Sequence, residues 1–364
     1  MSNYLVTVNL VILNGEKYIR HCLDGILGQT YPKELIEFNI LDNGSTDGTI
    51  DRITNYELRI KKNIPKFIFT KSKINLGMWP GQEELLKYSN GKYILGMAVD
   101  VILDKNFVKN AVEVMEQDSK IGAIQAKIYR FDQQPTTNDP QFTKIIDTCG
   151  FRIFKSRRIV NIGHGEKDRG QYDNLGEIFG IEGACPFFRK GTLENCGIEV
   201  RPRGFFEVEP QKLQTEIFDH DYFWYGDDLD LAWRMNLFGW KQVFVPSVIA
   251  WHDRQTTKNL KRNWSDYMFR VPARQQIPIK KRRLDWRNTR FTIIKNDYII
   301  NILKDLGYIL TREVAVLVYT LLFEPKVFLE LPRFLKLLPK MLQKRKEVMK
   351  RAQLSPEKIK KYFE

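Results

Sequence analysis

The chain has 364 residues, of which 43% are hydrophobic and 12% aromatic, so it can bury a sizeable core and is not a disordered polymer. Its net charge of +14 is confined to one end: residues 258–364 hold 26 Lys and Arg against 10 Asp and Glu, whereas residues 1–257 hold 32 against 34. The four cysteines are too few for a disulfide scaffold and show no C-x-x-C spacing, which indicates a reducing compartment.

Neither a secretory leader nor a membrane-spanning helix is predicted. The N-terminus, MSNYLVTVNLVIL, lacks a cationic region followed by a small-residue cleavage site. The longest uninterrupted apolar run, VAVLVYTLLF (314–323), has ten residues, and a helix that crosses a bilayer needs about 20. We therefore expect a cytoplasmic protein that at most rests on the inner face of the plasma membrane.

Predicted strands and helices alternate over the first hundred residues. The predicted strands are 5–13, 36–42, 66–71 and 92–103, the last interrupted by one aspartate. Apolar residues recur at helical spacing over 18–27, a short helix follows the loop NGSTDGT (43–49), and PGQEELLKYSNG (80–91) is a further helix. This alternation predicts a parallel sheet with covered faces. Neither G-x-G-x-x-G nor G-x-x-x-x-G-K-[ST] follows the first strand, so a dinucleotide or P-loop site is not expected.

Loops, a short helix and one more strand are predicted between residues 131 and 253. The loops are 131–141 and 163–176, the helix lies near 190–196, and the strand is 240–253. From about residue 258 the chain becomes basic and helical, so we divide it into 1–257 and a helical extension, 258–364. Five prolines are expected to break the extension into short helices: Pro272, Pro278, Pro325, Pro332 and Pro339.

Acidic residues stand where predicted strands end, and ligands of open parallel sheets bind there. Asp42 ends the second strand, although a turn or helix cap is an alternative explanation for it. Asp100 lies between apolar residues, where an unpaired carboxylate would be costly. His252 follows the last strand beside other acids. A hard-metal site made of Asp, His and substrate phosphates is therefore a hypothesis.

The stretch YGDDLDLAWRMNLFGW (225–240) holds three carboxylates in four positions. Asp227 and Asp228 would lie near a helix N-terminus, where the helix dipole favours negative charge. Asp230 and Arg234 are four residues apart and can pair on one helix face. A structural ion pair and helix caps are the alternative to a functional role. They explain Asp230 and Arg234 well, but they explain the presence of both Asp227 and Asp228 less well.

Together these features resemble the family 2 glycosyltransferases, which have the GT-A fold. The resemblance covers roughly residues 4–255. It rests on four stretches in order: VTVNLVILNGEKYIRHCLDGILGQTYP, ILDNGSTDGT, NLGMWPGQEELLKYSNGKYILGMAVD and YGDDLDLAWRMNLFGW. The fold it implies is α/β, a Rossmann-like, mostly parallel sheet flanked by helices, here with a basic helical extension at the C-terminus.

The resemblance implies inverting, metal-dependent transfer of a sugar from a nucleoside-diphosphate donor. A divalent metal, Mg²⁺ or Mn²⁺, would neutralise the diphosphate, and a carboxylate would take the proton of the acceptor hydroxyl. Asp228 matches this catalytic base, and Asp100 and His252 match the metal site. The implied nucleotide-sugar site comprises Leu13, Asn14, Glu16, Asp42, Asn75, Gly77 and Asp100. The implied acceptor site comprises Gly183, Asp227 and Trp251.

Two positions depart from the pattern of that family. Ala98 stands where the metal motif usually has its first acid. Many members that resemble rhamnosyltransferases have Asn-Pro-Asp there, which also leaves one carboxylate. Gln82 stands where many relatives have Asn, a change we expect to tune sugar recognition.

The end of the chain also resembles the tails of bacterial rhamnosyltransferase-like enzymes, which act on lipid-linked or growing surface polysaccharide. The two segments are RNTRFTIIKND (287–297) and REVAVLVYTLLFEPKVFLELPRFLKLLPKMLQKRKEVMKR (312–351). Phe and Leu interleaved with Lys and Arg can lie in a membrane interface. The alternative is a helical hairpin packed on the catalytic domain with its basic face in water. We expect a peripheral membrane protein that binds an anionic membrane surface, and no nucleic-acid partner.

On resemblance alone the expected donor is dTDP-rhamnose, and the expected acceptor is a glycan or lipid-linked glycan of cell-surface polysaccharide synthesis. A UDP-hexose or UDP-galactofuranose is the main alternative donor. A sugar-phosphate nucleotidyltransferase would need a Gly-rich triphosphate loop with Arg or Lys after the first strand, where this chain has LNGEKYIR. Retention of Asp42, Asp100, Asp228 and His252 together argues against a non-catalytic glycan-binding or nucleotide-binding module.

Overall fold

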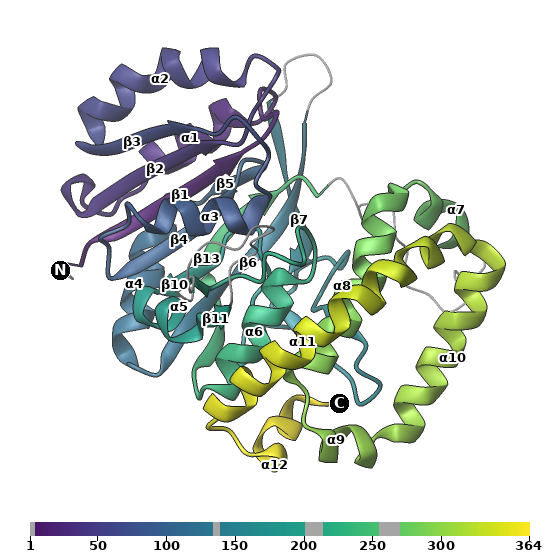
Figure 1. Cartoon of the computed structure of the whole chain (residues 1–364). Coiled ribbons are helices and arrows are strands. Elements are labelled where there is room, and N and C mark those ends of the chain that lie inside the picture. The colour runs from purple at the N-terminus through teal and green to yellow at the C-terminus, as the bar shows by residue number, and fades with distance from the viewer. Residues whose placement is uncertain (1–3, 134–138, 201–213, 255–269) are drawn as a thin grey trace, which may run out of the picture.

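A computed structural model describes residues 4–133, 139–200, 214–254 and 270–364 of the chain. A mixed sheet of nine strands runs through the molecule in the order β3-β2-β1-β4-β10-β6-β13-β5, and β7 pairs with β6 (Figure 1). Its strands are β1 Val6–Ile12, β2 Ile36–Asp42, β3 Lys66–Lys71, β4 Tyr93–Ala98, β5 Val101–Leu103, β6 Ile121–Gln133, β7 Pro140–Thr148, β10 Phe187–Arg189 and β13 Lys241–His252. Two small hairpin sheets pair β8 Phe151–Ile153 with β9 Ile159–Asn161, and β11 Ile198–Val200 with β12 Gln214–Glu216.

Helices cover the sheet and then form a separate group at the end of the chain (Figure 1). The first group is α1 Ile19–Leu27, η1 Lys33–Leu35, α2 Thr49–Asn63, α3 Met78–Leu86, α4 Phe107–Gln117, α5 Lys190–Cys196 and α6 Asp227–Leu237. The second is α7 Arg270–Gln275, α8 Ile279–Asn296, α9 Ile299–Lys304, α10 Leu306–Phe323, η3 Pro325–Glu330, α11 Leu331–Arg351, α12 Pro356–Ile359 and η4 Lys360–Tyr362. The predicted α/β architecture is confirmed.

The first part of the sheet is parallel, as the alternation of strands and helices predicts. Strands β3, β2, β1 and β4 are all parallel neighbours, and β1 and β2 are buried along their whole length. Their apolar runs are therefore explained by helices on both faces. Parallel pairing brings the carboxyl ends of β1, β2 and β4 to one edge, where Asn14, Asp42 and Asp100 stand. Antiparallel pairs appear at β10, β5 and β7.

The predicted strand 92–103 is two strands. The chain leaves the sheet at Val99 and Asp100, and β5 then pairs antiparallel with β13 on another part of the sheet. A carboxylate inside a buried ladder would lack partners, and the turn gives Asp100 access to the sheet edge instead. The backbone N–H of Asp253 donates to the Asp100 carbonyl at 3.2 Å. The break thus sets Asp100 beside the end of β13.

Two other boundaries differ from the predictions. Part of the predicted loop 131–141 is strand, because β6 continues to Gln133 and β7 begins at Pro140; residues 134–138 lie outside the described residues. Pro339 lies inside α11 and does not break it. A proline inside a helix costs about 3 kcal/mol, and packing of α11 along α8 offsets that cost. Pro325 and Pro332 stand in first helical turns, where proline is tolerated.

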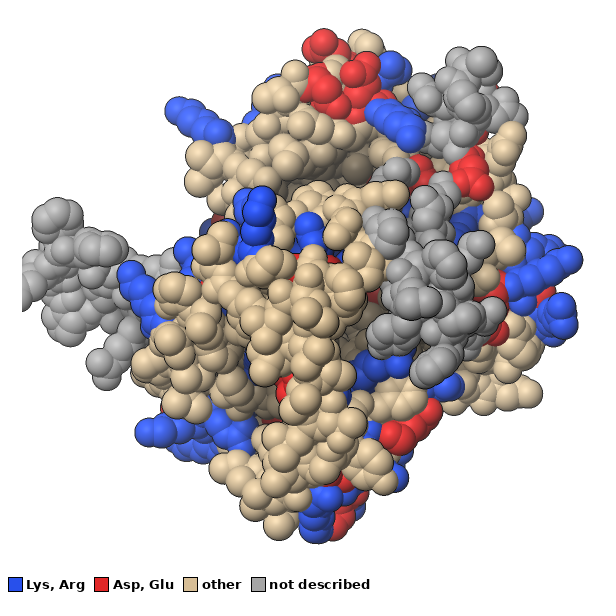
Figure 2. Space-filling view, turned by 90° about the vertical axis from the view of Figure 1, so that its right-hand side faces the viewer, with Lys and Arg blue, Asp and Glu red and all other residues tan. Residues whose placement is uncertain are grey.

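Helix α10 stands at the outer edge of the C-terminal helices, away from the sheet (Figure 1). It has 18 residues with a mean hydropathy of 1.6, and only 6% of it is buried, so its length and composition alone would suffice to cross a membrane. Arg312 and Glu313 interrupt the apolar run in the sequence but not the helix. The sequence argument from a ten-residue run therefore does not hold. Figure 2 looks onto this side, where a broad uncharged surface has Lys and Arg along its margins.

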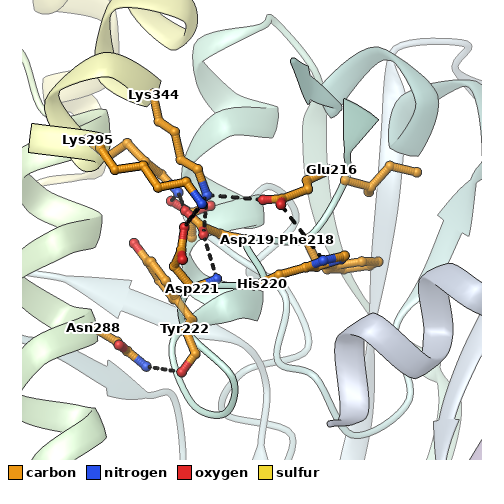
Figure 3. Close-up of polar contacts among 12 residues, drawn as sticks. Glu216, Phe218, Asp219, His220, Asp221, Tyr222, Asn288, Lys295 and Lys344 are labelled. Atoms are coloured by element: carbon orange, nitrogen blue, oxygen red, sulfur yellow. Dashed lines mark hydrogen bonds and ion pairs between the residues drawn. The ribbon is translucent and has the colours of Figure 1, made fainter. Parts of the chain in front are cut away.

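Part of the basic excess of the extension is turned inward onto acids of the first 257 residues (Figure 3). Lys295 lies 2.5 Å from Asp219 and 2.9 Å from Asp230. Lys344 lies 2.5 Å from Asp219 and 3.0 Å from Asp221. All five of these side chains are buried. The predicted alternative of a hairpin packed on the sheet domain with its cations in water is therefore only half right, because these cations hold the packing together.

Candidate active site

The loops that follow β1 and β2 are tied to each other. Asn14 Oδ1 accepts the backbone N–H of Thr46 at 2.8 Å, and the N–H of Asn14 donates to Ser45 Oγ at 2.9 Å. The buried Asp42 carboxylate accepts the N–H groups of Gly44 at 3.3 Å and Ser45 at 3.2 Å. These are the contacts of a turn, the alternative explanation for Asp42. Recognition of a base by Asp42 stays a prediction.

Leu13 and Glu16 flank Asn14 in the same loop. The Leu13 side chain is 41% exposed. Glu16 Oε2 accepts the N–H of Gly48, the residue before α2, at 3.1 Å, and Glu16 Oε1 lies 3.1 Å from Arg52. Glu16 thus holds the start of α2 next to the loop after β1. The structure brings these residues together with Asp42, as predicted for one site.

Asn75 and Gly77 connect this edge to the segment before α6. Asn75 Oδ1 accepts hydrogen bonds from Asn43 Nδ2 at 3.1 Å and from the N–H of Gly77 at 2.8 Å. Gly77 has a φ of +95°, and a Cβ there would lie 2.8 Å from the carbonyl oxygen of Phe223. Only glycine permits this close approach. The loop after β3 is therefore held against the loop that leads into Asp227 and Asp228.

Asp100 and His252 meet at the carboxyl ends of β4 and β13. His252 Nε2 lies 3.4 Å from Asp100 Oδ2, and His252 Nδ1 lies 2.9 Å from Oδ2 of the buried Asp147. Burial alone would lower the pKa of His252, but the charge of Asp100 outweighs it and raises the pKa to about 10. Burial opposes ionisation of Asp147, yet the charge of Arg254 holds its pKa well below the usual range.

The positions of Asp100 and His252 fit a divalent cation. Two ligand atoms at about 2.1 Å from one ion lie about 3 Å apart, close to the 3.4 Å observed. Asp147 holds Nδ1, so Nε2 is the atom that a cation would bind once it displaced the Nε2 proton, and this hydrogen-bonding arrangement is common in metal sites. No group of three or more His, Cys, Asp or Glu side chains suited to a metal occurs among the described residues. The remaining ligands would be phosphate oxygens and water, as is usual for Mg²⁺.

Asp228 stands in the first turn of α6, where the helix dipole faces it. Its Oδ2 accepts the N–H of Gly183 at 3.2 Å, and its Oδ1 accepts the N–H of Leu229 at 2.8 Å. Burial raises the pKa of Asp228 to about 7, and the Glu182 carboxylate adds to the rise. A Cβ at position 183 would lie 2.7 Å from the Trp79 ring and 3.1 Å from Asp228 Oδ2. Glycine is therefore required for Asp228 to sit where it does.

Asp227 and Asp230 have opposite surroundings on the same helix. Both oxygens of Asp227 are buried without a hydrogen-bond partner among the described residues, and only 1% of the residue is exposed. Burial, followed by the charge of Asp228, places its pKa well above the ordinary value. Asp230 lies 3.0 Å from Arg234 and accepts a hydrogen bond from Asn296 Nδ2 at 2.7 Å. The predicted Asp230–Arg234 ion pair is confirmed.

The loop before α6 has a strained backbone that α8 holds in place. Phe223 and Tyr225 have φ angles of 67° and 65°, which cost about 1–3 kcal/mol each for residues other than glycine. Asn288 Nδ2 donates to the carbonyls of Tyr222 at 3.2 Å, Trp224 at 2.9 Å and Tyr225 at 2.6 Å (Figure 3 shows the first of these). The basic extension thus supports the segment that carries Asp228.

Sequence reasoning missed a line of ion pairs that leads from Glu182, next to Asp228, to His252 and Asp100. The pairs run from Glu182, the charge next to Asp228, through Arg254 (2.7 Å) and Asp147 (2.8 Å) to His252. Asp147 lies in β7 and Glu182 in the loop before β10, and the sequence analysis predicted no strand at either position, so it gave no reason to single them out. Arg254 comes two residues after His252, but nothing in the sequence pairs it with acids distant in the chain.

Lys281 of α8 was also missed. Its ammonium lies 3.8 Å from the centre of the Tyr225 ring. Burial lowers the pKa of Lys281 to about 7, and the positive charge of Arg254 adds to this effect. Its position in a run of basic residues gave no reason to single it out. The extension therefore places a buried amine, as well as Asn288, beside the predicted site.

The contacts of two residues predicted to bind sugar, Trp251 and Gln82, do not connect them to the other predicted site residues. The Trp251 ring packs 4.6 Å from the Phe142 ring, and strand alternation turns it to the face opposite His252. Gln82 is buried, and its amide donates to backbone carbonyls of β1 and β4 at 3.2 and 3.3 Å. Gln82 therefore bridges two strands, and tuning of sugar recognition by it stays a prediction.

A cavity of about 1280 Å³ lies beside the site, between the β8–β9 hairpin and helices α8 and α10. His164 lines it, and His164 Nδ1 is 2.7 Å from the backbone oxygen of Asp147. Aromatic and arginine side chains dominate its wall: Phe154, Tyr172, Trp286, Tyr308, Tyr319, Arg152, Arg158, Arg274, Arg290 and Arg312. Such a wall offers apolar faces and hydrogen-bond donors for a large polar ligand.

Comparisons with known proteins find relatives of part of this chain. The family model described as glycosyl transferase family 2 matches residues 7–194. A dolichyl N-acetyl-alpha-D-glucosaminyl phosphate 3-beta-D-2,3-diacetamido-2,3-dideoxy-beta-D-glucuronosyltransferase of Methanococcus voltae is 32% identical over 116 residues, which are 32% of this chain and 35% of that protein. A poly(ribitol-phosphate) beta-glucosyltransferase of Bacillus spizizenii is 32% identical over 92 residues, 25% of this chain and 14% of that protein. The matches thus span about a third or less of these relatives.

Solved structures share the fold. The mannosyltransferase PcManGT from Pyrobaculum calidifontis, in complex with GDP-Man and Mn²⁺, has a TM-score of 0.52 at 15% identity, over 96% of this chain and 86% of that chain. GalNAc-T7 with UDP, GalNAc and Mn²⁺ has a TM-score of 0.52 at 12% identity, over 80% of this chain and 51% of that chain. At such identities these likenesses show the fold alone.

Proposed function

Since the chain belongs to glycosyl transferase family 2, we propose that it transfers a sugar from a nucleoside-diphosphate donor, with inversion at the anomeric carbon, in cell-surface polysaccharide synthesis. The observation that carries the proposal is the Asp228 carboxylate. It is oriented by two backbone N–H groups and has a pKa of about 7. A general base works best when its pKa is near the operating pH.

In the proposed reaction Asp228 takes the proton of an acceptor hydroxyl while that oxygen bonds to the anomeric carbon. The bond from this carbon to the diphosphate oxygen breaks, and the nucleoside diphosphate leaves. The N–H groups of Gly183 and Leu229 hold the Asp228 carboxylate in a fixed orientation throughout. Asp100 and His252 are proposed to hold Mg²⁺ or Mn²⁺, which when bound would offset the charge of the diphosphate. Mn²⁺ is present in both similar structures named above.

The donor site is proposed at the carboxyl ends of β1, β2 and β4. It comprises the residues predicted for it, with Asp42 toward the base: Leu13, Asn14, Glu16, Asp42, Asn75, Gly77 and Asp100. Our proposed donor is dTDP-rhamnose, with a UDP-hexose or UDP-galactofuranose as the alternative. The support is the tie between the loops after β1, β2 and β3, which makes them one surface.

For the acceptor we propose a glycan or lipid-linked glycan. Gly183 and Asp227, next to the base, and Trp251 are its predicted contacts, and the large cavity between the β8–β9 hairpin and α10 offers room for further sugar units. Residues 1–257 are proposed as the catalytic domain and 258–364 as an extension that meets an anionic membrane at the inner face of the plasma membrane.

The proposal is tested by incubating the purified protein with UDP-, dTDP- and GDP-sugars and measuring release of nucleoside diphosphate and thermal shift, with Mg²⁺, Mn²⁺ or EDTA. We expect turnover and stabilisation with a dTDP- or UDP-sugar, and loss of turnover in EDTA. Stabilisation by GDP but by neither dTDP nor UDP would overturn the pyrimidine donor. Full activity in EDTA would overturn the metal site at Asp100 and His252.

A further inference from the structure

Helix α10 turns its apolar residues outward and its charged residues inward, toward α8. Its outward stripe is formed by Leu306, Leu310, Val314, Leu317, Val318 and Leu321, each between 41% and 58% exposed; these six residues are called the apolar face below. The inward side carries the polar groups, because Glu313 lies 2.5 Å from Arg290 of α8 and Thr320 is buried. A helix that faces water shows the reverse pattern.

The inward side of α10 forms one wall of the cavity beside the active site. Tyr308, Arg312 and Tyr319 line the cavity, while the apolar face lies on the other side of the helix. α10 therefore separates this cavity from the exterior, and the six residues of its apolar face point to the exterior. An exposed apolar strip of this kind marks an interaction surface.

The charges around α10 are sorted by sign. The acids of this region point inward to arginines: Asp305 to Arg157 at 2.7 Å, Glu324 to Arg274 at 2.8 Å, and Glu330 to Arg287 at 2.8 Å. The exposed charges of α9, η3 and the start of α11 are all cations: Lys304, Lys326, Arg333 and Lys336. None of these four makes an ion pair within the described part of the chain. The outward surface thus combines the apolar face with these four exposed cations. Figure 2 shows a broad uncharged surface on this side, with Lys and Arg, and also some Asp and Glu, near its margins. An apolar face with cations around it suits anionic lipid.

The attachment of α10 decides between lying on a membrane and crossing it. The helix is held to α8 through Glu313 and Arg290, and the residue after it, Glu324, is buried against Arg274 and Arg282. At 1.5 Å per residue its 18 residues measure about 27 Å, close to the hydrocarbon thickness of about 30 Å, so the attachment of the helix decides and its length does not. A crossing would break these ion pairs, whereas a helix parallel to the bilayer keeps them.

We propose that the apolar face of α10 lies in the interface of an anionic lipid bilayer, parallel to its plane, with Lys304, Lys326, Arg333 and Lys336 on the head groups. The inference deepens the membrane partner proposed above and rests on it. It brings the cavity behind α10 to the membrane surface, where the head group of a lipid-linked acceptor would be.

The test is co-sedimentation of the full chain with vesicles of phosphatidylcholine alone or mixed with phosphatidylglycerol. We expect binding to the anionic vesicles that weakens as salt is added. The triple variant Leu310→Gln, Leu317→Gln, Leu321→Gln is expected to lose about tenfold or more of this binding, because it removes apolar area from the interface. Leu58→Gln is the matched control, since Leu58 of α2 is 84% exposed, and we expect it to bind as the unaltered chain does.

The outcomes distinguish membrane binding by α10 from the proposed glycosyltransferase activity. Equal binding by the triple variant and the unaltered chain would overturn the apolar face and leave the membrane partner standing. No binding by either would overturn both, while donor turnover in solution would still decide the glycosyltransferase activity. A dimer in light scattering that the triple variant abolishes, without vesicle binding, would make a second copy the occupant and overturn the proposal.

Depth measurements test the orientation. Leu310→Trp and Leu321→Trp place a fluorophore near each end of the apolar face. Quenching by brominated lipids is expected to report the same shallow depth for both tryptophans if the helix lies in the plane. One shallow and one deep tryptophan would show a crossing helix and overturn the proposed orientation.

Discussion

Two groups of aspartates lie within twelve residues of each other and have opposite electrostatics. Asp219 and Asp230 are buried against Lys295, and that lysine, despite burial, holds the pKa of both carboxyls below the usual range (Figure 3). Asp227 and Asp228 are reached by no cation at ion-pair distance within the described residues, and burial raises the pKa of both. The pKa values of these aspartates thus differ because lysines of α8 and α11 contact Asp219 and Asp230 but not Asp227 and Asp228.

The difference teaches that the C-terminal helices act on the site in two ways. They neutralise the acids that hold the packing, and within the described residues they bring no cation to ion-pair distance of Asp228. Burial therefore keeps Asp228 basic enough to accept a proton near neutral pH. They also fix the strained loop before α6 through Asn288. Substitutions at Asp228, Lys295, Asn288 and Glu182 test these roles one at a time.

The largest effect is expected from Asp228→Asn. An amide cannot accept the hydroxyl proton, so kcat should fall by about 10²–10⁴, measured as release of nucleoside diphosphate in the presence of acceptor. Folding should be intact, because Asp228 makes no ion pair with any residue that the structure describes. Asp228→Glu, which keeps the carboxylate, serves as the partial control. Undiminished turnover by the Asn variant would show that Asp228 is not the base.

Lys295→Met tests the neutralised pair, Asp219 and Asp230. It leaves Asp219 and Asp230 short of their shared cation, and removal of one partner of a buried ion pair costs about 3–5 kcal/mol. The free energy of unfolding should fall by that order in chemical denaturation. Lys336→Met, at an exposed lysine without an ion pair among the described residues, should change it little. Equal effects of both variants would contradict the inward role of Lys295.

A smaller effect is expected from Asn288→Ala. Three backbone carbonyls lose a donor, and an unsatisfied buried polar group costs about 1–3 kcal/mol. Because the loop carries Asp228, kcat should drop by about tenfold or more while the KM for the donor stays nearly constant. A stability loss with unchanged kcat would show that Asn288 supports the fold alone and does not position the base.

The subtlest test is the pH dependence of kcat/KM. Because the pKa of Asp228 is raised to about 7, the carboxylate is protonated and inactive below that pH. Activity should therefore rise with pH through about 7 and then level off. Glu182→Gln removes the neighbouring negative charge that contributes to the raised pKa, so the rise should move to lower pH. A rise that stays in place would show that Glu182 does not act on the base.

Much of the fold follows from local sequence patterns. Apolar runs separated by helical spacing predicted strands β1, β2, β3 and β13 within one or two residues. Four-residue spacing predicted the Asp230–Arg234 pair, which the structure confirms at 3.0 Å. These features depend on neighbours close in the chain, so the sequence alone is sufficient for them.

Only the tertiary structure decided what reaches each acid and which way α10 faces. Asp147 and Glu182 are joined to His252 and Asp228 through Arg254, and Asn288 meets the loop before α6 from more than sixty residues away. No periodicity records such contacts, because they depend on how helices and strands pack. The polarity of α10 is likewise invisible in its apolar run, since only packing on α8 determines that its charged residues point inward and its leucines outward.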